Sequence, residues 1–176
     1  MAAPLTVSRP ELLKDGTDAA FRNCVHKLLA FSVRLETIRS GFGERLGLSG
    51  IQYTILITVA HLNDNKGISV KRIARHLALS GAFITIETGK LEKKGLITKK
   101  QDPEDRRAVL VQVTKKGSAL LADLAHVQVK VNDVLFASLS RQDFERLNKM
   151  LAGMVQGADE AAAMIAYLSA SARTGS

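Results

Sequence analysis

The chain has 176 residues, of which 46% are hydrophobic, and it carries a formal net charge of +8. A chain of this length can bury the core of one domain with helical extensions. Its longest apolar run, TILITVA at 54–60, is shorter than the roughly 18 to 20 residues of a membrane span, and the N-terminus lacks the basic and apolar regions of a secretory signal. The single cysteine, Cys24, has no partner for an internal disulfide. We therefore expect a cytoplasmic protein with no membrane partner.

The positive charge is concentrated in the middle third of the chain, whereas both ends are nearly balanced. An excess of positive charge favours polyanionic partners such as nucleic acid, although a basic pI is a weak signal by itself. The basic residues of this third are Lys71, Arg72, Arg75, Lys90, Lys93, Lys94, Lys99, Lys100, Arg106, Arg107, Lys115 and Lys116.

The first half of the chain predicts a loose arm followed by helices. Residues 1–16 contain two prolines and no sustained periodicity. From Thr17 the apolar residues keep helical spacing, and SGFG at 40–43 is expected to interrupt this helix. Ser49 is placed to cap a second helix that ends at 63–67 (NDNKG), and Ser69 to cap a short third one.

The stretch SGAFITIETGKLEKKG at 80–95 can be read as a strand or as a helix. Its middle is aromatic and β-branched, which favours a strand. Its flanks favour a helix, because Ser80 suits an N-cap and Gly95 suits a left-handed stop. Ile84, Thr88 and Leu91 then share one helical face, and the preceding turn has helix-turn-helix spacing. We predict a helix over 81–94 that depends on tertiary packing.

The second half predicts a hairpin and two long helices. LITKKQ (96–101) and AVLVQV (108–113) flank the turn DPEDRR and are typical of two strands. Helical patterns follow, one to about Ser138 and one from the cap Ser140. The expected fold is mainly α with a small β-hairpin wing. Its parts are an arm (1–16), a dimerisation helix and link (17–48), a winged helix-turn-helix lobe (49–117) and C-terminal dimerisation helices (118–170).

A winged helix-turn-helix suits double-stranded DNA. Its second helix fits the major groove, and arginines at a hairpin tip suit the negative potential of the minor groove. We expect Asp105 to orient a neighbouring wing residue, or merely to pair with an arginine. Lys71, Arg72 and Arg75 are expected to contact phosphates or to lie on a solvated helix face. The remaining candidate DNA-binding residues are Ser80, Ala82, Phe83, Thr85, Ile86, Lys90, Lys99, Lys100, Arg106 and Arg107.

Two motifs give the chain a family resemblance. DPEDRRAVLVQVTKKG resembles the wing of the MarR (multiple antibiotic resistance regulator) family of bacterial transcription factors, with its D-x-R, strand and T-x-x-G. GLSGIQY is similar to the family's entry into its second helix. The resemblance covers roughly residues 20–165. It implies an obligate homodimer, formed by about 17–40 and 118–168, that binds a palindromic operator.

The helix expected over 81–94, which would contact the bases, departs from the family pattern. Many members have an arginine where this chain has Ile86, and a leucine usually packs where it has Glu87. Gly89 lies in the middle of the helix. Apolar contacts with thymine methyl groups are therefore expected to replace some hydrogen bonds to bases.

The resemblance also implies a small-molecule effector between the dimer helices and the lobe. In this chain that junction is expected at Arg34, Ile38, Tyr53 and His61, with Arg34 binding an anionic ligand, such as an aromatic acid or acyl-CoA. A salt bridge from Arg34 to Glu36 or another local acid is the alternative. The expected function is a repressor released from DNA by the effector.

Other chemistries find less support in the sequence. Cys24 lies roughly where a redox-sensing branch of the family has its reactive cysteine, but we expect a buried, inert thiol. The histidines lack metal-ligand spacing, and no nucleotide-binding or catalytic motif is present. We expect no cofactor, no metal and no enzymatic activity. Two alternatives remain, a redox-sensing repressor using Cys24 and a winged-helix module for protein interaction.

Overall fold

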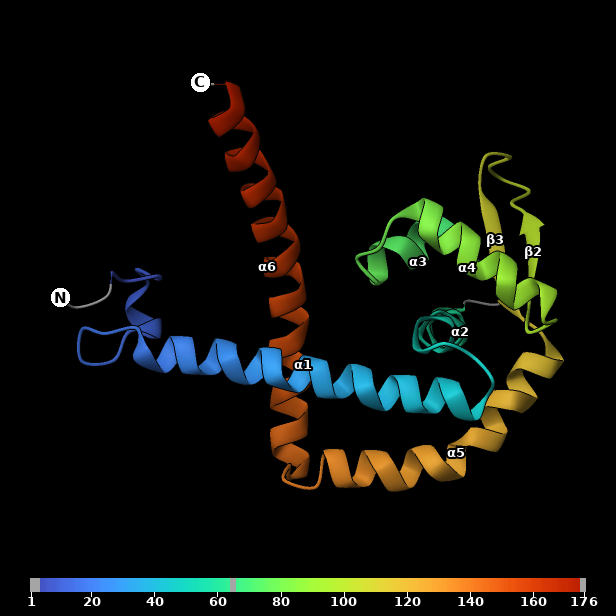
Figure 1. Cartoon of the computed structure of the whole chain (residues 1–176), viewed down its shortest axis with the longest axis horizontal. Coiled ribbons are helices and arrows are strands. Elements are labelled where there is room, and N and C mark those ends of the chain that lie inside the picture. Colours follow the sequence, from blue (N-terminus) through green and yellow to red (C-terminus); the bar gives the residue numbers. More distant parts are fainter. Residues whose placement is uncertain (1–3, 64–65, 175–176) are drawn as a thin grey trace. The chain divides into compact units, whose positions relative to one another are not determined.

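The computed structural model describes residues 4–63 and 66–174, which form helices and one small sheet (Figure 1). By its internal contacts the chain divides into two compact units, residues 1–128 and 129–176. Within the described residues the fold is mainly α with a three-stranded antiparallel sheet, as predicted. The elements are a 3₁₀ turn at Pro10–Leu12, α1 (Ala19–Arg45), α2 (Gly50–Leu62), β1 (Ile68–Ser69), α3 (Val70–His76), α4 (Gly81–Lys93), β2 (Ile97–Gln101), β3 (Val109–Val113), α5 (Lys115–Leu135) and α6 (Arg141–Thr174).

Three serines begin the helices of the lobe, as the sequence predicts. The side chains of Ser49, Ser69 and Ser80 each accept a hydrogen bond from a backbone N–H in the first turn of α2, α3 and α4. Ser49 forms a full capping box, because the side chain of Gln52 also accepts from the Ser49 N–H. Asn63 ends α2, and residues 64 and 65 of the expected stop lie outside the described residues.

The ambiguous stretch at 80–95 is a helix, α4, and its side chains explain how it is held. Ile84, Thr88 and Leu91 are completely buried in the core of the lobe. The Thr88 hydroxyl donates to the carbonyl of Ile84 at 2.6 Å, so its burial leaves no unmet hydrogen bond. Gly95 ends the helix with φ at +71°, in the left-handed region predicted for it.

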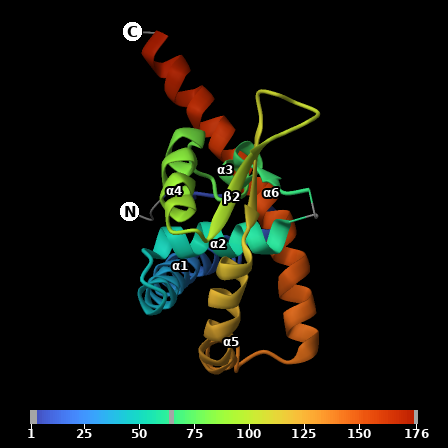
Figure 2. The same ribbon diagram turned by 90° about the vertical axis from the view of Figure 1, so that its right-hand side faces the viewer.

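The three strands of the sheet are arranged in the order β1-β3-β2. β2 and β3 pair in antiparallel register, with Ile97 opposite Val113 and Gln101 opposite Val109, so they form the predicted hairpin. The two-residue strand β1 pairs with β3 and was not predicted, because two residues carry no periodicity. Figure 2 shows the hairpin extending past α3 and α4.

SGFG does not interrupt the first helix, contrary to the prediction. α1 continues through 40–43 and ends at Arg45. Gly43 is buried, and a Cβ on it would lie 2.8 Å from the backbone oxygen of Ser49. The glycine therefore allows α1 to pass close to the start of α2, and the helix tolerates it because packing outweighs intrinsic propensity.

The N-terminal arm was expected to be loose, but the described part of it is tied to the start of α1. The Asp18 carboxylate accepts hydrogen bonds from the Thr6 N–H and hydroxyl, at 2.8 and 2.6 Å. It also pairs with Arg22, whose guanidinium donates to the carbonyl of Pro4. These bonds lower the pKa of Asp18 to about 2, and the bond from the Thr6 hydroxyl has the largest effect.

The two C-terminal helices follow the predicted pattern. α6 begins after Ser140, whose hydroxyl accepts from the Asp143 N–H at 3.2 Å. It runs as one uninterrupted helix (Figure 1), and none of the side chains described in it is buried. No helix in the described part of the chain is both long enough and apolar enough to span a membrane.

Candidate nucleic-acid interface

The outward face of α4 is apolar at its N-terminal end. Ala82, Phe83, Thr85 and Ile86 are exposed, on the side opposite the buried Ile84. The first turns of a recognition helix are the part that reaches base edges in the major groove. The candidate base-reading residues of the sequence are thus all accessible on one face.

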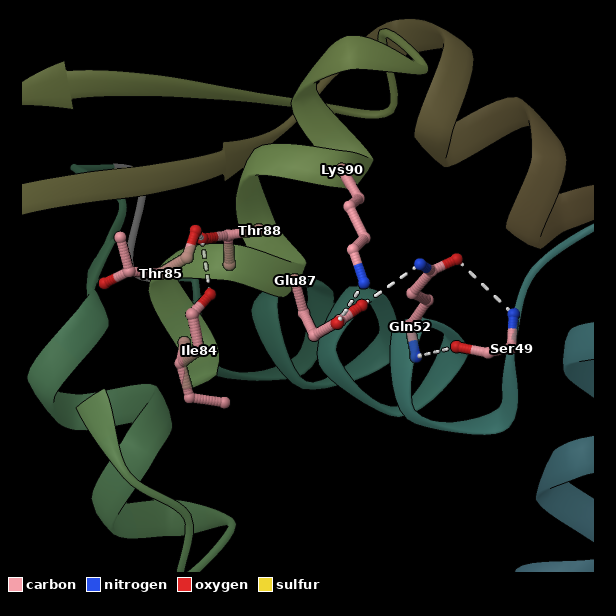
Figure 3. A network of polar contacts seen from close by, with 7 residues as sticks. All are labelled: Ser49, Gln52, Ile84, Thr85, Glu87, Thr88 and Lys90. Atoms are coloured by element: carbon pink, nitrogen blue, oxygen red, sulfur yellow. Dashed lines mark hydrogen bonds and ion pairs between the residues drawn. The ribbon is translucent and has the colours of Figure 1, made fainter. Parts of the chain in front are cut away.

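Behind this face a buried carboxylate connects α4 to α2 (Figure 3). Glu87 is only 6% exposed, and its oxygens accept from Lys90 Nζ at 2.6 Å and from Gln52 Nε2 at 3.1 Å. The Lys90 hydrogen bond is the main reason that the pKa of Glu87 lies below its ordinary value. Gln52 also belongs to the capping box of α2, so one chain of hydrogen bonds runs from Ser49 to Lys90. Lys90, predicted to contact DNA, is held by a protein partner.

Lys99 fastens the hairpin to the same helix. Its Nζ donates to the carbonyl of Thr85 at 3.2 Å, and its backbone N–H donates to Glu92 Oε1 at 3.1 Å. Lys99 is half-buried, whereas its neighbour Lys100 is exposed. Lys99 therefore positions α4 against β2, and Lys100 is the lysine of this strand that solvent reaches more freely.

The wing turn is shaped by the carboxylate predicted to orient it. Asp105 Oδ1 accepts from the backbone N–H of Arg107 at 2.9 Å, and the Asp105 carbonyl accepts from the Ala108 N–H at 2.8 Å. Gln101 Nε2 donates to the carbonyl of Arg106. The bond from Asp105 thus goes to the backbone of a neighbour, Arg107, within the turn. The side chains of Arg106 and Arg107 are exposed.

A groove of about 780 Å³ lies between α4 and the wing, and residues of α3 also line it. Three cations line it, Lys71, Lys99 and Arg107, and the carboxylates of Asp102 and Asp105 also face it. Arg72 lies elsewhere, in a second groove of about 540 Å³ with Lys66 and Glu104. The exposed Arg75 lies on α3. The structure therefore separates the three α3 cations considered from the sequence, since Lys71 lines the first groove and Arg72 the second.

The predicted effector residues lie on two helices. Arg34 and Ile38 are one turn apart on α1, where the exposed Arg34 donates to the carbonyl of Ala30 at 2.9 Å. This bond takes the place of the alternative salt bridge to Glu36. His61 is exposed near the end of α2, two turns beyond the buried Tyr53.

Tyr53 has partners that the sequence did not indicate. Its hydroxyl accepts from Gln128 Nε2 at 2.8 Å, and its ring meets Phe42 edge-on with 5.7 Å between centroids. The guanidinium carbon of Arg39 lies 5.4 Å from the ring centroid, and Arg39 Nε donates to Thr54. Burial raises the pKa of Tyr53. Arg39, and not Arg34, is the cation beside this tyrosine, a pairing that only the α1–α2 contact reveals.

The thiol of Cys24 is exposed in this chain, so the expectation of a buried thiol is wrong. The buried residues of α1 are Phe42 and Gly43, near its C-terminal end, whereas Cys24 lies in its first turns. No group of three or more His, Cys, Asp or Glu residues able to hold a metal ion occurs among the residues described.

The comparisons with known proteins agree with this geometry. A model described as MarR family matches residues 46–108. The transcriptional regulator MhqR of Bacillus subtilis is 30% identical over 105 residues, which cover 60% of this chain and 70% of MhqR. The same fold occurs in the DNA complex of MepR from S. aureus, with a TM-score of 0.62, 20% identity and coverage of 76% and 96%. The operator complex of E. coli MarR C80S gives a TM-score of 0.61, 18% identity and coverage of 73% and 91%.

The family resemblance carried by DPEDRRAVLVQVTKKG and GLSGIQY is thereby confirmed, and the named relatives are regulators rather than enzymes. The match to MhqR extends over most of that protein, and the matched model includes α2, α3, α4 and the wing turn. The chain belongs to the MarR family of transcriptional regulators.

Proposed function

We propose that the protein is a homodimeric repressor that binds a palindromic operator in double-stranded DNA and is released by a small anionic effector. The observation that carries the DNA-binding part is the single lobe in which α4 and the arginine turn flank a groove lined by three cations and two carboxylates. With α4 in the major groove and the wing at the next minor groove, the phosphate strand between them passes over Lys71 and Lys99. MepR and MarR C80S, which share the fold, have been solved with DNA.

The homodimer is proposed from the apolar surface of the long helices. α6 exposes large apolar side chains along its length, among them Met150, Met154, Ile165 and Leu168, at 49% to 63%. α1 likewise exposes Leu29 and other apolar residues. Contiguous apolar surface of this extent marks an interaction site in a soluble protein. A second copy of the chain is the proposed occupant, as the family resemblance implies.

The effector is proposed to bind near the α1–α2 contact, at the predicted Arg34, Ile38, Tyr53 and His61. Arg39 joins this set, because it lies against the Tyr53 ring. A ligand acts only through its difference in affinity between the DNA-binding and the released dimer. A thermal-shift screen of aromatic acids and acyl thioesters, followed by DNA release, would identify it. Hits that bind equally to Arg34→Ala and Arg39→Ala would remove both cations from the site.

The DNA-binding proposal is tested by fluorescence anisotropy of the full-length protein on a duplex enriched from random sequences. The protein should prefer that duplex to unrelated DNA by about a thousandfold or more. The variant Arg106→Ala with Arg107→Ala should lose a few kcal/mol, on the order of 1–3 kcal/mol for each arginine that contacts DNA. Lys100→Ala is the matched control and should mainly lower the salt slope, by about one.

Two results would count against this proposal. A double-arginine variant that binds as wild type does would show that the wing is not a DNA contact. Failure of wild type to discriminate any duplex would favour the protein-interaction module instead.

A further inference from the structure

We propose that α4 reads 5-methyl groups of pyrimidines in the major groove, those of thymine above all, and that Ile86 and Phe83 make these contacts. The inference rests on the proposed function, since it concerns how the same helix selects its DNA. It goes further by naming the chemical group that is recognised and the two residues that recognise it.

The side chains most accessible at the start of α4 are apolar. Ile86 is 58% exposed and Phe83 is 37% exposed, whereas the other two large hydrophobic residues of α4, Ile84 and Leu91, are completely buried. Ala82 adds a methyl group to the same region. These positions fall within the first six residues of α4, the part of a recognition helix that meets base edges. Nothing in the folding of the lobe requires an isoleucine there.

The polar side chains of α4, by contrast, are engaged within the protein. α4 is described in full, and five of its six polar side chains have a hydrogen bond to another protein group. The Thr85 hydroxyl donates to the carbonyl of Gly81 at 2.8 Å. Lys90, on the next turn, donates to the buried Glu87 at 2.6 Å. The hydrogens that Thr85 and Lys90 donate in these two bonds are not offered to bases.

The usual hydrogen-bonding readers are missing from the helix sequence itself. GAFITIETGKLEK contains no arginine, asparagine or glutamine, which are the side chains that read guanine and adenine in pairs of hydrogen bonds. Lys90 gives one of its three ammonium N–H groups to Glu87, which keeps the ammonium close to that carboxylate; moving away would leave the buried carboxylate with Gln52 as its remaining partner. The cost of an under-paired buried charge opposes that movement.

The C5-methyl of thymine is the apolar group that a base pair presents in the major groove. 5-Methylcytosine presents the same group at the same carbon. An apolar reading face therefore selects 5-methylpyrimidines by burying their methyl groups. Burial of one methyl group corresponds to about a fourfold gain in affinity.

The experiment compares thymine with uracil, which lacks only the methyl group. Duplexes bound by the full-length protein are first enriched from a random thymine library. Each thymine of the enriched half-site is then replaced singly by uracil, and Kd is measured by anisotropy for wild type, Ile86→Ala and Phe83→Ala. Both residues are on the surface, and alanine favours a helix, so the variants should fold. Lys100→Ala serves as a control that changes affinity equally for both bases.

Wild type should bind about fourfold more weakly for each thymine methyl removed at a position that α4 contacts. Each variant, Ile86→Ala or Phe83→Ala, should lose this preference at the thymine that its missing side chain contacts. It should bind the duplex with thymine there and the duplex with uracil there equally. Replacing that thymine by cytosine or 5-methylcytosine should show the same preference for the methylated base. Uracil opposite the wing should have no effect, because the minor-groove oxygen of thymine is unchanged in uracil.

Three outcomes would overturn the inference, and they differ from failure of the proposed function. Equal Kd for thymine and uracil at every position would show that α4 does not read methyl groups, while selective binding would still support the repressor. A uracil effect that persists in both variants would remove Ile86 and Phe83 as readers. If no sequence is enriched at all, the proposed function fails and this inference fails with it.

Discussion

α4 and α6 are both helices, but they are stabilised in different ways. α4 has 13 residues, many of them poor helix formers, and it completely buries Ile84, Thr88 and Leu91. α6 has 34 residues with an alanine-rich second half, and it buries none of its described side chains. Short helices are marginal in water, so α4 depends on the core around it. α6 has good intrinsic propensity and an apolar surface that its own chain leaves in solvent.

The buried side chains of α4 contribute to folding of the lobe, whereas the exposed apolar side chains of α6 are proposed to contribute to assembly. The core of the lobe is closed, with residues such as Ile55, Leu56 and Val111 at 0% exposure. Substitutions in α4 should therefore change stability within one chain. Substitutions in α6 should change the association of chains.

The largest expected effect is loss of the dimer when the apolar surface of α6 is charged. Leu151→Glu with Met154→Glu places two carboxylates where the proposed interface buries apolar groups, and glutamate keeps helix propensity. Light scattering at micromolar concentration should then report a monomer. Gln156→Glu with Ala163→Glu adds the same charge on the opposite side of α6 and should leave a dimer. Equal masses for the two variants would exclude this face of α6 from the interface.

The next largest effect is expected in the core of the lobe. Ile84→Ala removes a completely buried side chain and should destabilise the lobe by about 2 to 5 kcal/mol. Urea denaturation followed by circular dichroism measures the loss. Ile86→Ala, two residues along the same helix and exposed, should cost far less. Similar losses from the two variants would contradict the burial pattern of α4.

Much of the lobe could be predicted because its signals are local. The caps Ser49, Ser69 and Ser80 act within one turn, so their sequence spacing suffices. The hairpin could be predicted from the two β-branched runs on either side of DPEDRR. The end of α4 at Gly95 could be predicted because glycine favours the left-handed conformation. The helix at 81–93 required one further step, which was to weigh its face of Ile84, Thr88 and Leu91 against its β-branched composition.

The features that could not be predicted depend on contacts between distant residues. Gly43 remains helical because α1 passes Ser49, and no local rule contains that contact. The sequence marked Glu87 as unusual but not its partner Gln52, which is 35 residues away. Likewise Arg39 meets Tyr53 only after α1 and α2 pack together. The exposure of Cys24 was missed because a helix pattern does not say which end of the helix is covered.

A smaller effect is expected from the buried carboxylate that joins α4 to α2. Glu87→Ala leaves the Gln52 amide without its acceptor and should cost about 1 to 3 kcal/mol. Because the folded pKa of Glu87 is lowered, this stabilisation is fully present above the unfolded pKa of about 4.3 and is lost as the pH falls through the folded pKa. Urea denaturation of wild type and variant should therefore differ more at pH 7 than at strongly acidic pH.

Lys90→Met tests the cause of that pKa. It removes the hydrogen bond that chiefly lowers the pKa of Glu87, so the stabilisation should be lost at a higher pH than in wild type. Glu92→Ala is the control on the same helix, since Glu92 is exposed and accepts one backbone N–H from Lys99. If the free energy of unfolding of Lys90→Met depends on pH as that of wild type does, the pair with Lys90 is not what lowers the pKa of Glu87.

The smallest effect, and the one opposite in sign, is expected at the glycine inside α4. Gly89→Ala should stabilise the lobe by about 0.5 to 1 kcal/mol, because alanine restricts the unfolded chain and favours the helix. The new Cβ would lie 3.8 Å from Lys99 Nζ, which is an ordinary van der Waals contact. Gly117→Ala in α5 is the matched control, since its Cβ would overlap the Leu96 carbonyl and lie 2.8 Å from Val113 Cγ1. Urea denaturation should move the two midpoints in opposite directions. A loss of stability in Gly89→Ala would mean that α4 needs the glycine for its packing, which would weaken the contrast between its buried and exposed faces.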